Sequence, residues 1–367
     1  MRVLMLSKAC IVGIYQRKLE MMAALAPDMA LTVAVPPYWK DERGVTTLES
    51  IHVSGYRLEV LPMVFNGQFH WHFYPTLGRL LRDVQPDIVH IDEEPYNLAT
   101  YHANRLARQN NRKTLWFSWQ NLVRRYPPPF AWMERYNMRH VDHALVGSQT
   151  AAQVWQQKGY RGPLSVIPQF GVDPDRFQPP QVSRSSAPIH IAYVGRLVPE
   201  KGIDVLLAAL NGLAGDWRCT ILGDGPDADQ LRATTMTLGL AKRVTFSPWI
   251  SSVNMPGFYQ EVDVLVLPSR TRPNWIEQFG RVLIEAMACG VAVVGANTGE
   301  IPHVIGDAGL VFPEADVREL QDRLTQLIRD PDLRAALGTR GRERVLASFT
   351  QRQIAVETLQ VYKELLQ

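Results

Sequence analysis

Short apolar runs alternate with amphipathic helical segments along this chain, and the alternation limits the fold more than any other feature. The runs lack the polar alternation of half-exposed strands, which indicates strands buried on both faces. Such strands belong to parallel sheets that are covered by helices. In the first half we expect strands at Val3–Leu6, Leu31–Val35, Leu58–Leu61, Ile88–Ile91, Thr114–Phe117, Ala144–Val146 and Ser165–Ile167, with helices at Gln16–Leu25, Leu77–Val84, Asn97–Arg108, Phe130–Arg139 and Thr150–Gln157.

The pattern stops after residue 170 and restarts at residue 189. The segments Gly171–Pro180 and Ser183–Ser186 hold prolines, glycine and serines without an apolar period, which is typical of a linker. After it we expect strands at Ile189–Val194, Cys219–Leu222, Val244–Phe246, Val262–Leu267, Val291–Val294 and Leu310–Phe312, and helices at Ile203–Leu210, Asp229–Leu238, Val282–Cys289, Val317–Ile328, Leu333–Leu346 and Gln351–Leu366.

We therefore predict an α/β protein with two Rossmann-like domains, residues 1–170 and 189–348, that face each other across a cleft and are joined by a linker, residues 171–188. A chain of 367 residues is too long for one ordinary core, which agrees with two domains. In open parallel sheets, ligands bind beyond the carboxyl ends of the strands. The residues that directly follow strands are therefore the first candidates for function.

The charge balance narrows the class of partner. Lys and Arg number 39 against 36 Asp and Glu, so the net charge is only +3. No run rich in Lys or Arg is present either, and we expect no nucleic acid partner. A mildly basic face could still rest on an anionic membrane surface.

The cysteines and the apolar runs indicate the compartment. Cys10, Cys219 and Cys289 fit neither a zinc spacing nor a disulfide framework, and we interpret them as buried thiols in a reducing cytoplasm. No run approaches the ~20 apolar residues that span a bilayer. The first residues are typical of a strand rather than a signal peptide. We expect a cytoplasmic protein, soluble or peripheral at the inner membrane face.

The loop Gly195–Gly202 follows the expected strand that ends at Val194. Gly195 allows a sharp turn, and Arg196 and Lys201 place two cations ahead of a helix. Arginine offers a bidentate fork for phosphate oxygens, lysine a compact charge, and the helix start adds amide donors. The loop is therefore a candidate phosphate site, although a solvated charged loop explains the same residues equally well.

A second cluster surrounds the start of the helix expected at Val282–Cys289. Glu277 lies in the loop before this helix, and Glu285 lies within it among apolar residues. A carboxylate can accept hydrogen bonds from both vicinal hydroxyls of a ribose, and the amides of Phe279 and Gly280 can meet a phosphate. The alternative for Glu285 is a buried Glu–Arg pair.

The pattern Glu277-x-Phe279-Gly280, followed after four residues by Glu285-Ala-Met-Ala-x-Gly, resembles that of the large retaining glycosyltransferase family four, which has the GT-B fold. Such a string of motifs is far more specific than any one of them. Together the motifs cover most of residues 189–316 in the family's order, and the N-terminal half resembles the family mainly in outline. The further matching motifs are Gly195–Gly202, Gly223–Pro226, Gly299–Pro302, Asp307–Pro313 and, before the linker, Gly171-Val172-Asp173 with Phe177.

The resemblance implies a retaining, metal-independent hexosyltransferase that moves a sugar from a UDP- or GDP-sugar to a hydroxyl of a saccharide, lipid-linked or small-molecule acceptor. This activity would serve polysaccharide, glycolipid or glycoside synthesis, with the nucleotide-sugar as substrate and with no cofactor. Arg196 and Lys201 would neutralise the diphosphate, Glu277 would contact the transferred sugar, and Glu285 would hold the ribose. The implied donor-binding set is Gly195, Arg196, Lys201, Trp249, Ile250, Glu277, Phe279, Gly280 and Glu285.

For the N-terminal domain, the resemblance implies that Gly13 and Tyr15 approach phosphate and acceptor. It also implies that a last helix, residues 349–367, crosses back to this domain. Many members carry a histidine after the fifth N-terminal strand, but the stretch here, residues 117–121, has none. Ser118, Gln120 or Asn121 could hydrogen-bond a sugar hydroxyl instead. His303 stands where a glutamate is common, which leaves the identity of the donor sugar open.

Three further clusters have competing interpretations. Asp227 and Asp229 form an Asp-x-Asp, which binds metal in other glycosyltransferases, but carboxylates at a helix start explain it better. The aromatic and histidine run Gln68–Tyr74 could stack on a sugar, whereas its two histidines lack carboxylate neighbours in sequence and are weak metal candidates. Glu94 and its neighbours after the strand Ile88–Ile91 either belong to the acceptor site or cap the next helix.

Three other functions fit part of the sequence. A sugar-nucleotide epimerase would share the two-domain fold but isomerise the donor, and a nucleotide-sugar sensor would bind it without turnover. A dinucleotide-dependent oxidoreductase is disfavoured because neither domain opens with Gly-x-Gly-x-x-Gly. The Arg/Lys and Glu/Glu sets are both complete, so transfer remains the favoured function.

Overall fold

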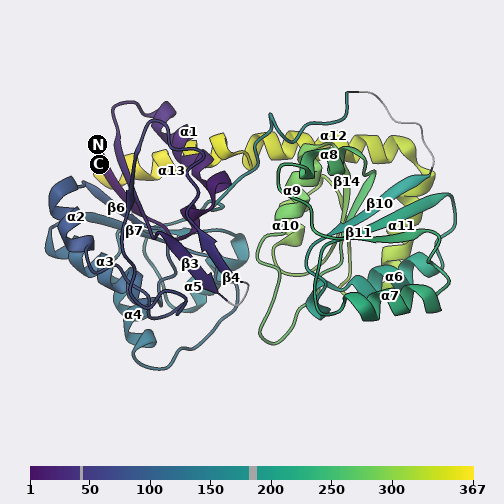
Figure 1. Cartoon of the computed structure of the whole chain (residues 1–367), viewed down its shortest axis with the longest axis horizontal. Helices are drawn as coiled ribbons and strands as arrows, with labels where there is room; N and C mark the ends of the chain where they lie inside the picture. Colours follow the sequence, from purple (N-terminus) through teal and green to yellow (C-terminus); the bar gives the residue numbers. More distant parts are fainter. Residues whose placement is uncertain (42–43, 182–187) are drawn as a thin grey trace. The chain divides into compact units, whose positions relative to one another are not determined.

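The computed structural model describes residues 1–41, 44–181 and 188–367, and the chain divides into two compact units (Figure 1). Unit 1 comprises Met1–Gly171 together with Gln351–Gln367, and unit 2 comprises Val172–Thr350. The chain therefore begins and ends in unit 1, where the two termini lie near each other in Figure 1.

The segment expected to be a linker is largely part of unit 2. Val172 forms a bridge with Thr350, and Phe177 is buried beside the ring of Tyr259. The serine-rich run Ser183–Ser186 lies outside the described residues. Composition alone suggested a separate linker because the buried residues in this segment are too few to form a period.

Unit 1 contains, within the described residues, a seven-stranded sheet of order β5-β2-β1-β6-β7-β8-β9. All neighbouring strands pair in parallel; Val3, for example, lies between Leu31 and Ile88. The predicted parallel sheet is confirmed. Its strands are β1 (Arg2–Leu6), β2 (Ala30–Val35), β5 (Arg57–Val60), β6 (Ile88–Ile91), β7 (Lys113–Ser118), β8 (His143–Val146) and β9 (Leu164–Val166).

Helices cover both faces of this sheet because successive residues of a strand point to opposite sides. Val3 and Met5 of β1 belong to one apolar cluster, whereas Leu4 and Leu6 belong to the other. The first cluster includes side chains of α1 and α13, and the second those of α2, α3 and α5. The helices of unit 1 are α1 (Arg17–Leu25), α2 (Leu77–Val84), α3 (Leu98–Gln109), α4 (Phe130–His140), α5 (Gln149–Gln157) and α13 (Gln351–Leu366).

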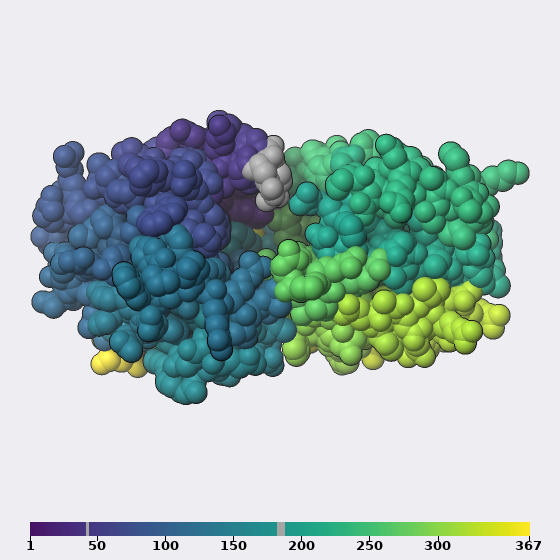
Figure 2. Space-filling model, turned by 90° about the horizontal axis from the view of Figure 1, so that it is seen from below, coloured from purple at the N-terminus to yellow at the C-terminus, as the bar shows by residue number. Residues whose placement is uncertain are grey.

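The last helix, α13, packs on unit 1 although it follows unit 2 in the sequence. Ile354, Leu359 and Tyr362 are buried in the same apolar cluster as β1, and the Tyr362 hydroxyl lies 2.6 Å from Nδ1 of His90 on β6. In Figure 2, yellow atoms of this end of the chain appear on unit 1, apart from the yellow-green helices of unit 2.

Unit 2 contains a six-stranded sheet of order β12-β11-β10-β13-β14-β15 among its described residues, and these strands also pair in parallel. The strands are β10 (Ile189–Val194), β11 (Trp217–Leu222), β12 (Val244–Ser247), β13 (Val264–Leu267), β14 (Ala292–Ala296) and β15 (Leu310–Phe312). The helices are α6 (Ile203–Asn211), α7 (Ala228–Thr237), α8 (Met255–Gln260), α9 (Arg281–Ala288), α10 (Ile301–Ile305), α11 (Val317–Arg329) and α12 (Pro331–Ser348).

Several short elements were not anticipated from the sequence. Helices α8 and α10 are too short to show a helical period, and 3-10 turns at Ala9–Ile11, Gly13–Gln16 and Pro199–Lys201 show none either. The antiparallel strands β3 (Tyr38–Asp41) and β4 (Gly44–Thr47) are partly or fully exposed, so they lack the buried apolar run by which the other strands were recognised.

The expectation of three buried thiols is confirmed, and burial raises the pKa of each cysteine to about 12. In the parts of the chain that the structure describes, no helix combines the length and the apolar character that a bilayer-spanning segment needs.

Candidate active site

The loops after β10, β11 and β13 of unit 2 are packed backbone against backbone. Gly223 has φ 146°, and a Cβ atom there would lie 1.9 Å from the carbonyl oxygen of Gly195. At Gly202, with φ 66°, a Cβ would lie 2.0 Å from the carbonyl oxygen of Pro268. Only glycine tolerates such approaches, so these motif glycines fix the cation-bearing loop against its neighbours.

Lys201 and Glu277, both singled out from the sequence, meet in the structure. Lys201 Nζ lies 2.6 Å from Glu277 Oε2, and the same oxygen accepts a 2.9 Å hydrogen bond from Ser269 Oγ. The Lys201 ammonium also lies 4.7 Å from the ring centroid of Trp275. Glu277 is 7% exposed, so its charge is held by these neighbours more than by water.

The backbone of Glu277 is held as firmly as its side chain. Its carbonyl accepts a hydrogen bond from the amide of Glu300, and a Cβ on Gly299 would lie 2.2 Å from that oxygen. The Gly299–Pro302 motif therefore supports the loop that carries Glu277. Sequence reasoning missed Ser269 and Trp275 as members of this site, since neither residue type is distinctive on its own.

Arg196 and Trp249 are exposed at the surface of unit 2, and Ile250 is partly exposed. The Arg196 side chain is exposed, and its carbonyl accepts a 2.8 Å hydrogen bond from the Tyr193 hydroxyl. Trp249 is 53% exposed, and its amide donates to Asp224 Oδ2 at 3.0 Å. Ile250 is half-buried. The exposed indole is suited to stacking on a planar base.

Glu285 has the partner that the alternative interpretation named. On α9, Arg281 Nε lies 3.0 Å from Glu285 Oε1, and Tyr259 on α8 donates its hydroxyl to Oε2 at 3.0 Å. Burial raises the pKa of the Glu285 carboxyl, and Arg281 and Tyr259 oppose this shift. Gly280 is the residue before α9, with φ 79°, and Phe279 is buried. A ribose at Glu285 would thus share a carboxylate that already accepts two bonds.

Asp227 and Asp229 lie at the start of α7, as the structural interpretation of the Asp-x-Asp expected. Asp227 is the residue before the helix, and the Asp229 side chain is fully exposed with Arg232 at 3.8 Å. Among the described residues, no group of three or more His, Cys, Asp or Glu side chains could hold a metal ion.

In unit 1, Gly13 and Tyr15 contact other parts of the same unit. The Gly13 amide donates to Glu49 Oε2 at 2.6 Å, and a Cβ there would lie 2.5 Å from Ile51 Cδ1. The Tyr15 ring stacks on Phe170 with centroids 3.9 Å apart. A phosphate at the Gly13 amide would therefore have to displace Glu49.

Glu94, Ser118 and Gln120 come together at the carboxyl ends of β6 and β7. Ser118 Oγ donates to Glu94 Oε2 at 2.6 Å, and the amide of Trp119 donates to Oε1 at 2.8 Å. The Gln120 amide donates to Ser118 Oγ at 3.0 Å. Asn121, the next residue in the chain, is half-buried. Helix α3 begins after Asn97, so the interpretation of the Glu94 carboxylate as a helix cap is wrong.

A second charged group lies at the same edge of the sheet. Lys8, which follows β1, pairs with Glu93, and His72 Nε2 lies 3.5 Å from the same carboxylate. Burial alone would raise the pKa of Glu93, but Lys8 and His72 outweigh it and hold the pKa at about 2. The histidines of residues 68–74 have no carboxylate neighbour in sequence, but the fold gives His72 one in space, because Glu93 lies just after β6.

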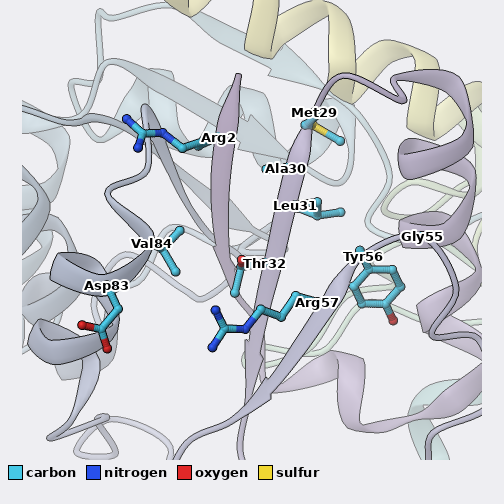
Figure 3. A pocket seen from close by; sticks show the side chains of 10 residues that line it. All are labelled: Arg2, Met29, Ala30, Leu31, Thr32, Gly55, Tyr56, Arg57, Asp83 and Val84. Atoms are coloured by element: carbon cyan, nitrogen blue, oxygen red, sulfur yellow. The ribbon is translucent and has the colours of Figure 1, made fainter.

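A pocket of about 640 Å³ lies at the opposite, amino-terminal edge of the unit 1 sheet (Figure 3). Arg2, Arg57 and Asp83 are among the side chains around it, and it contains none of the predicted site residues. Since ligands of parallel sheets bind at the carboxyl ends of the strands, this pocket is not part of the candidate site.

Two family models match the chain in succession. Residues 20–176 match the model described as Glycosyltransferase Family 4, and residues 175–344 match Glycosyl transferases group 1. A GDP-mannose-dependent alpha-(1-6)-phosphatidylinositol monomannoside mannosyltransferase of Mycobacterium tuberculosis is 31% identical over 220 residues, which are 56% of this chain and 57% of that protein. An alpha-maltose-1-phosphate synthase of Mycolicibacterium smegmatis is 31% identical over 54% of this chain and 51% of that protein. The chain thus spans about half the length of these curated relatives.

Solved structures resemble the whole chain. A glycosyltransferase from Rickettsia africae has a TM-score of 0.76 at 18% identity and covers 100% of this chain and 98% of that one. Anabaena HepE in complex with UDP has a TM-score of 0.75 at 18% identity, covering 99% and 100%. A sucrose-phosphate synthase from Thermosynechococcus elongatus has a TM-score of 0.71 at 19% identity, covering 100% and 99%. At these identities the likeness concerns the fold.

Proposed function

The chain belongs to glycosyltransferase family 4 and has the GT-B fold, and from this premise we propose that it transfers a sugar from a nucleotide-diphosphate-sugar to a hydroxyl acceptor with retention at the anomeric carbon. The observation that supports this most is the Lys201–Glu277 pair, supplemented by Ser269, on loops that motif glycines fix in place. It puts a cation for a diphosphate beside a carboxylate for a sugar.

The reaction breaks the bond between the anomeric carbon and the diphosphate oxygen and forms a bond from that carbon to the acceptor oxygen. Negative charge develops on the leaving diphosphate while the sugar gains oxocarbenium character. Arg196, Lys201 and the amides at Phe279 and Gly280 would stabilise the diphosphate. The leaving phosphate would take the acceptor's proton, so the acceptor approaches on the face that the leaving group vacates and the configuration is retained.

In this proposal the two cations replace the metal that some other glycosyltransferases use, and no cofactor takes part. Lys201 is held by Glu277 before any ligand binds, which lowers the entropy cost of placing it against the diphosphate. The diphosphate would bind to the remaining N–H donors of Lys201 without breaking this ion pair, and Glu277 would accept a hydrogen bond from a sugar hydroxyl.

The donor would be a UDP- or GDP-sugar, and the acceptor a saccharide, a lipid-linked saccharide or a small molecule in polysaccharide, glycolipid or glycoside synthesis. Two similar proteins support this range: one is a GDP-mannose-dependent phosphatidylinositol monomannoside mannosyltransferase, and HepE was solved in complex with UDP. We also propose a cytoplasmic location with peripheral contact at a membrane, because a mildly basic protein can reach a lipid-linked acceptor there.

The direct test is a panel of UDP- and GDP-sugars, first by thermal shift and then by transfer to saccharide and lipid acceptors. A donor that binds the native state raises the melting temperature by mass action. Consumption of the donor into a new glycoside supports the proposal. Isomerisation of the donor would identify an epimerase, and binding without turnover would identify a sensor; either result contradicts the proposal.

We expect Glu285→Ala to raise the donor KM about tenfold or more and to change kcat by less than about threefold, because a ribose contact is made equally in the ground and transition states. The structure requires a control, since the change also leaves Arg281 and Tyr259 without their partner. Tyr259→Phe removes one of these bonds and keeps the carboxylate, so its KM should stay near wild type. Unchanged donor KM with collapsed kcat in Glu285→Ala would contradict the role.

A further inference from the structure

Glu94 is tied to the end of a neighbouring strand by both of its carboxylate oxygens. It lies after β6, and its donors, Ser118 Oγ and the Trp119 amide, lie at the end of β7 and directly after it. Ser118 is fully buried, whereas Glu94 is partly exposed. The carboxylate therefore stands at the boundary between the interior of unit 1 and the carboxyl edge of its sheet.

The Ser118 hydroxyl extends this link by one residue. It donates to Glu94 and accepts a hydrogen bond from the Gln120 amide at 3.0 Å. A single direction of donation thus runs from the Gln120 amide through the Ser118 hydroxyl to the Glu94 carboxylate. This direction requires a carboxylate that accepts, because the Ser118 hydroxyl has only one proton to donate.

Glu94 itself is fixed by its own backbone. Its carbonyl accepts hydrogen bonds from the Asn97 amide at 3.0 Å and from Thr100 Oγ1 at 2.8 Å, at the start of α3. The Trp119 indole is held on the other side, where its Nε1 donates to Gln169 Oε1 at 2.9 Å. The segment after β7 is therefore clamped between a rigid carboxylate and a buried amide.

We propose that Glu94 is a positioning residue: through Ser118 and the Trp119 amide it holds residues 119–121 in the conformation that meets the sugar, and loss of its charge releases this segment. The proposal rests on the proposed transfer function, because it assigns the segment after β7 to the sugar side of the site. It gives Glu94 no contact with the reacting atoms, and its effect passes through the segment.

The Glu94 carboxyl gains its proton near neutral pH, where the effect of losing its charge can be measured. Burial raises the pKa of this carboxyl to about 7, and the bonds from Ser118 and Trp119 oppose the shift only in part. The segment should therefore be fully held above this pH and released below it. The charged and titratable groups that act on Glu94 or respond to it are Glu93, Lys8, Tyr96, Tyr126 and Lys158.

Protonation of Glu94 has opposite effects on stability and on positioning: it favours the folded state but releases the segment after β7. The pKa of Glu94 is higher in the folded chain than its ordinary value of 4.5, so the folded state binds more protons between pH 4.5 and 7. The stability contributed by proton uptake is present below pH 4.5 and is lost as the pH rises through 7. Glu94→Gln removes this loss, so the melting temperature of the wild type should fall relative to this variant as the pH rises through that range.

The decisive experiment is hydrogen–deuterium exchange resolved to single amides, at pH 8, on the full-length chain without donor. In Glu94→Gln the protection factor of the Trp119 amide or of the Gln120 amide should fall about tenfold or more, because an NH2 group takes the place of one acceptor oxygen. Facing Trp119, this group removes the acceptor of the Trp119 amide; facing Ser118, it donates to the hydroxyl that accepts from Gln120. In Ser118→Ala only the Gln120 amide should lose protection, since Trp119 still donates to Glu94. Glu59→Gln, at a residue on β5 paired with Arg57, is the matched control and should change neither.

Turnover against pH gives the functional readout. Wild-type kcat should fall about tenfold below an apparent pKa near 7, and Glu94→Gln should have a low kcat without this acid limb and a donor KM within about threefold of wild type. Unchanged protection at both Trp119 and Gln120 in Glu94→Gln, or an acid limb that persists in this variant, overturns the proposal. If no donor is transferred at all, the proposed function fails, and the exchange measurement still decides whether Glu94 holds the segment.

Discussion

Arg196→Ala is expected to lower turnover by about 10²- to 10⁴-fold, while the wild-type enzyme keeps its activity after exhaustive chelation with EDTA. Charge on the diphosphate grows as the sugar–phosphate bond breaks, and a preorganised cation stabilises this charge without reorganisation. Arg196 is exposed at the turn after β10, so its removal leaves no buried group unpaired and should leave the melting temperature nearly unchanged. Arg196→Lys should recover only part of the loss, because a point charge cannot reproduce the bidentate fork.

Lys201→Ala is expected to lower turnover by a comparable factor, but with a structural cost that Arg196→Ala lacks. The change removes the ion pair of a nearly buried carboxylate and leaves Glu277 with the bond from Ser269. The double variant should lose less than the product of the single losses, because both cations face one leaving group.

Lys242→Ala, at an exposed lysine of unit 2 beyond the site loops, is the control for the loss of one positive charge. Steady-state transfer is measured in each variant with and without EDTA. Activity that EDTA abolishes and Mn²⁺ or Mg²⁺ restores would assign Asp227 and Asp229 to a metal and contradict the metal-free mechanism.

Glu277→Gln should lower kcat by about 10²-fold or more, the scale of one lost transition-state interaction. The amide keeps the size of the side chain and can still accept the hydrogen bond from Ser269, so the loop should stay in place. What it loses is the negative charge that holds Lys201 and that would face the positive character of the reacting sugar.

Glu343→Gln, at an exposed residue of α12, controls for the removal of a carboxylate from unit 2. The kinetics of both variants are compared with their melting temperatures. Turnover close to wild type in Glu277→Gln would show that Glu277 only shapes the loop, together with the Gly299–Glu300 backbone that contacts its carbonyl.

The sequence by itself determined the fold class and most of the elements. The buried strands were predicted to within a few residues, and helices α2 and α13 have the predicted bounds. These elements could be predicted because the spacing of apolar residues along a segment indicates whether one or both of its faces are buried. Short or exposed elements such as β3, β4 and α8 were not predicted, since a helix of six residues or an exposed strand shows no such apolar period.

The tertiary structure decided which candidate residues meet. Sequence motifs placed Lys201 and Glu277 on separate loops, 76 residues apart, and only the pairing of β10 with β13 explains how their side chains come within 2.6 Å. In the same way the fold gave Glu285 its partner Tyr259, turned Glu94 toward Ser118 rather than toward a helix end, and put Glu93 beside His72. Burial of a residue can be predicted from the apolar period of the segment around it. The partner of a polar side chain, in contrast, depends on which distant elements lie side by side.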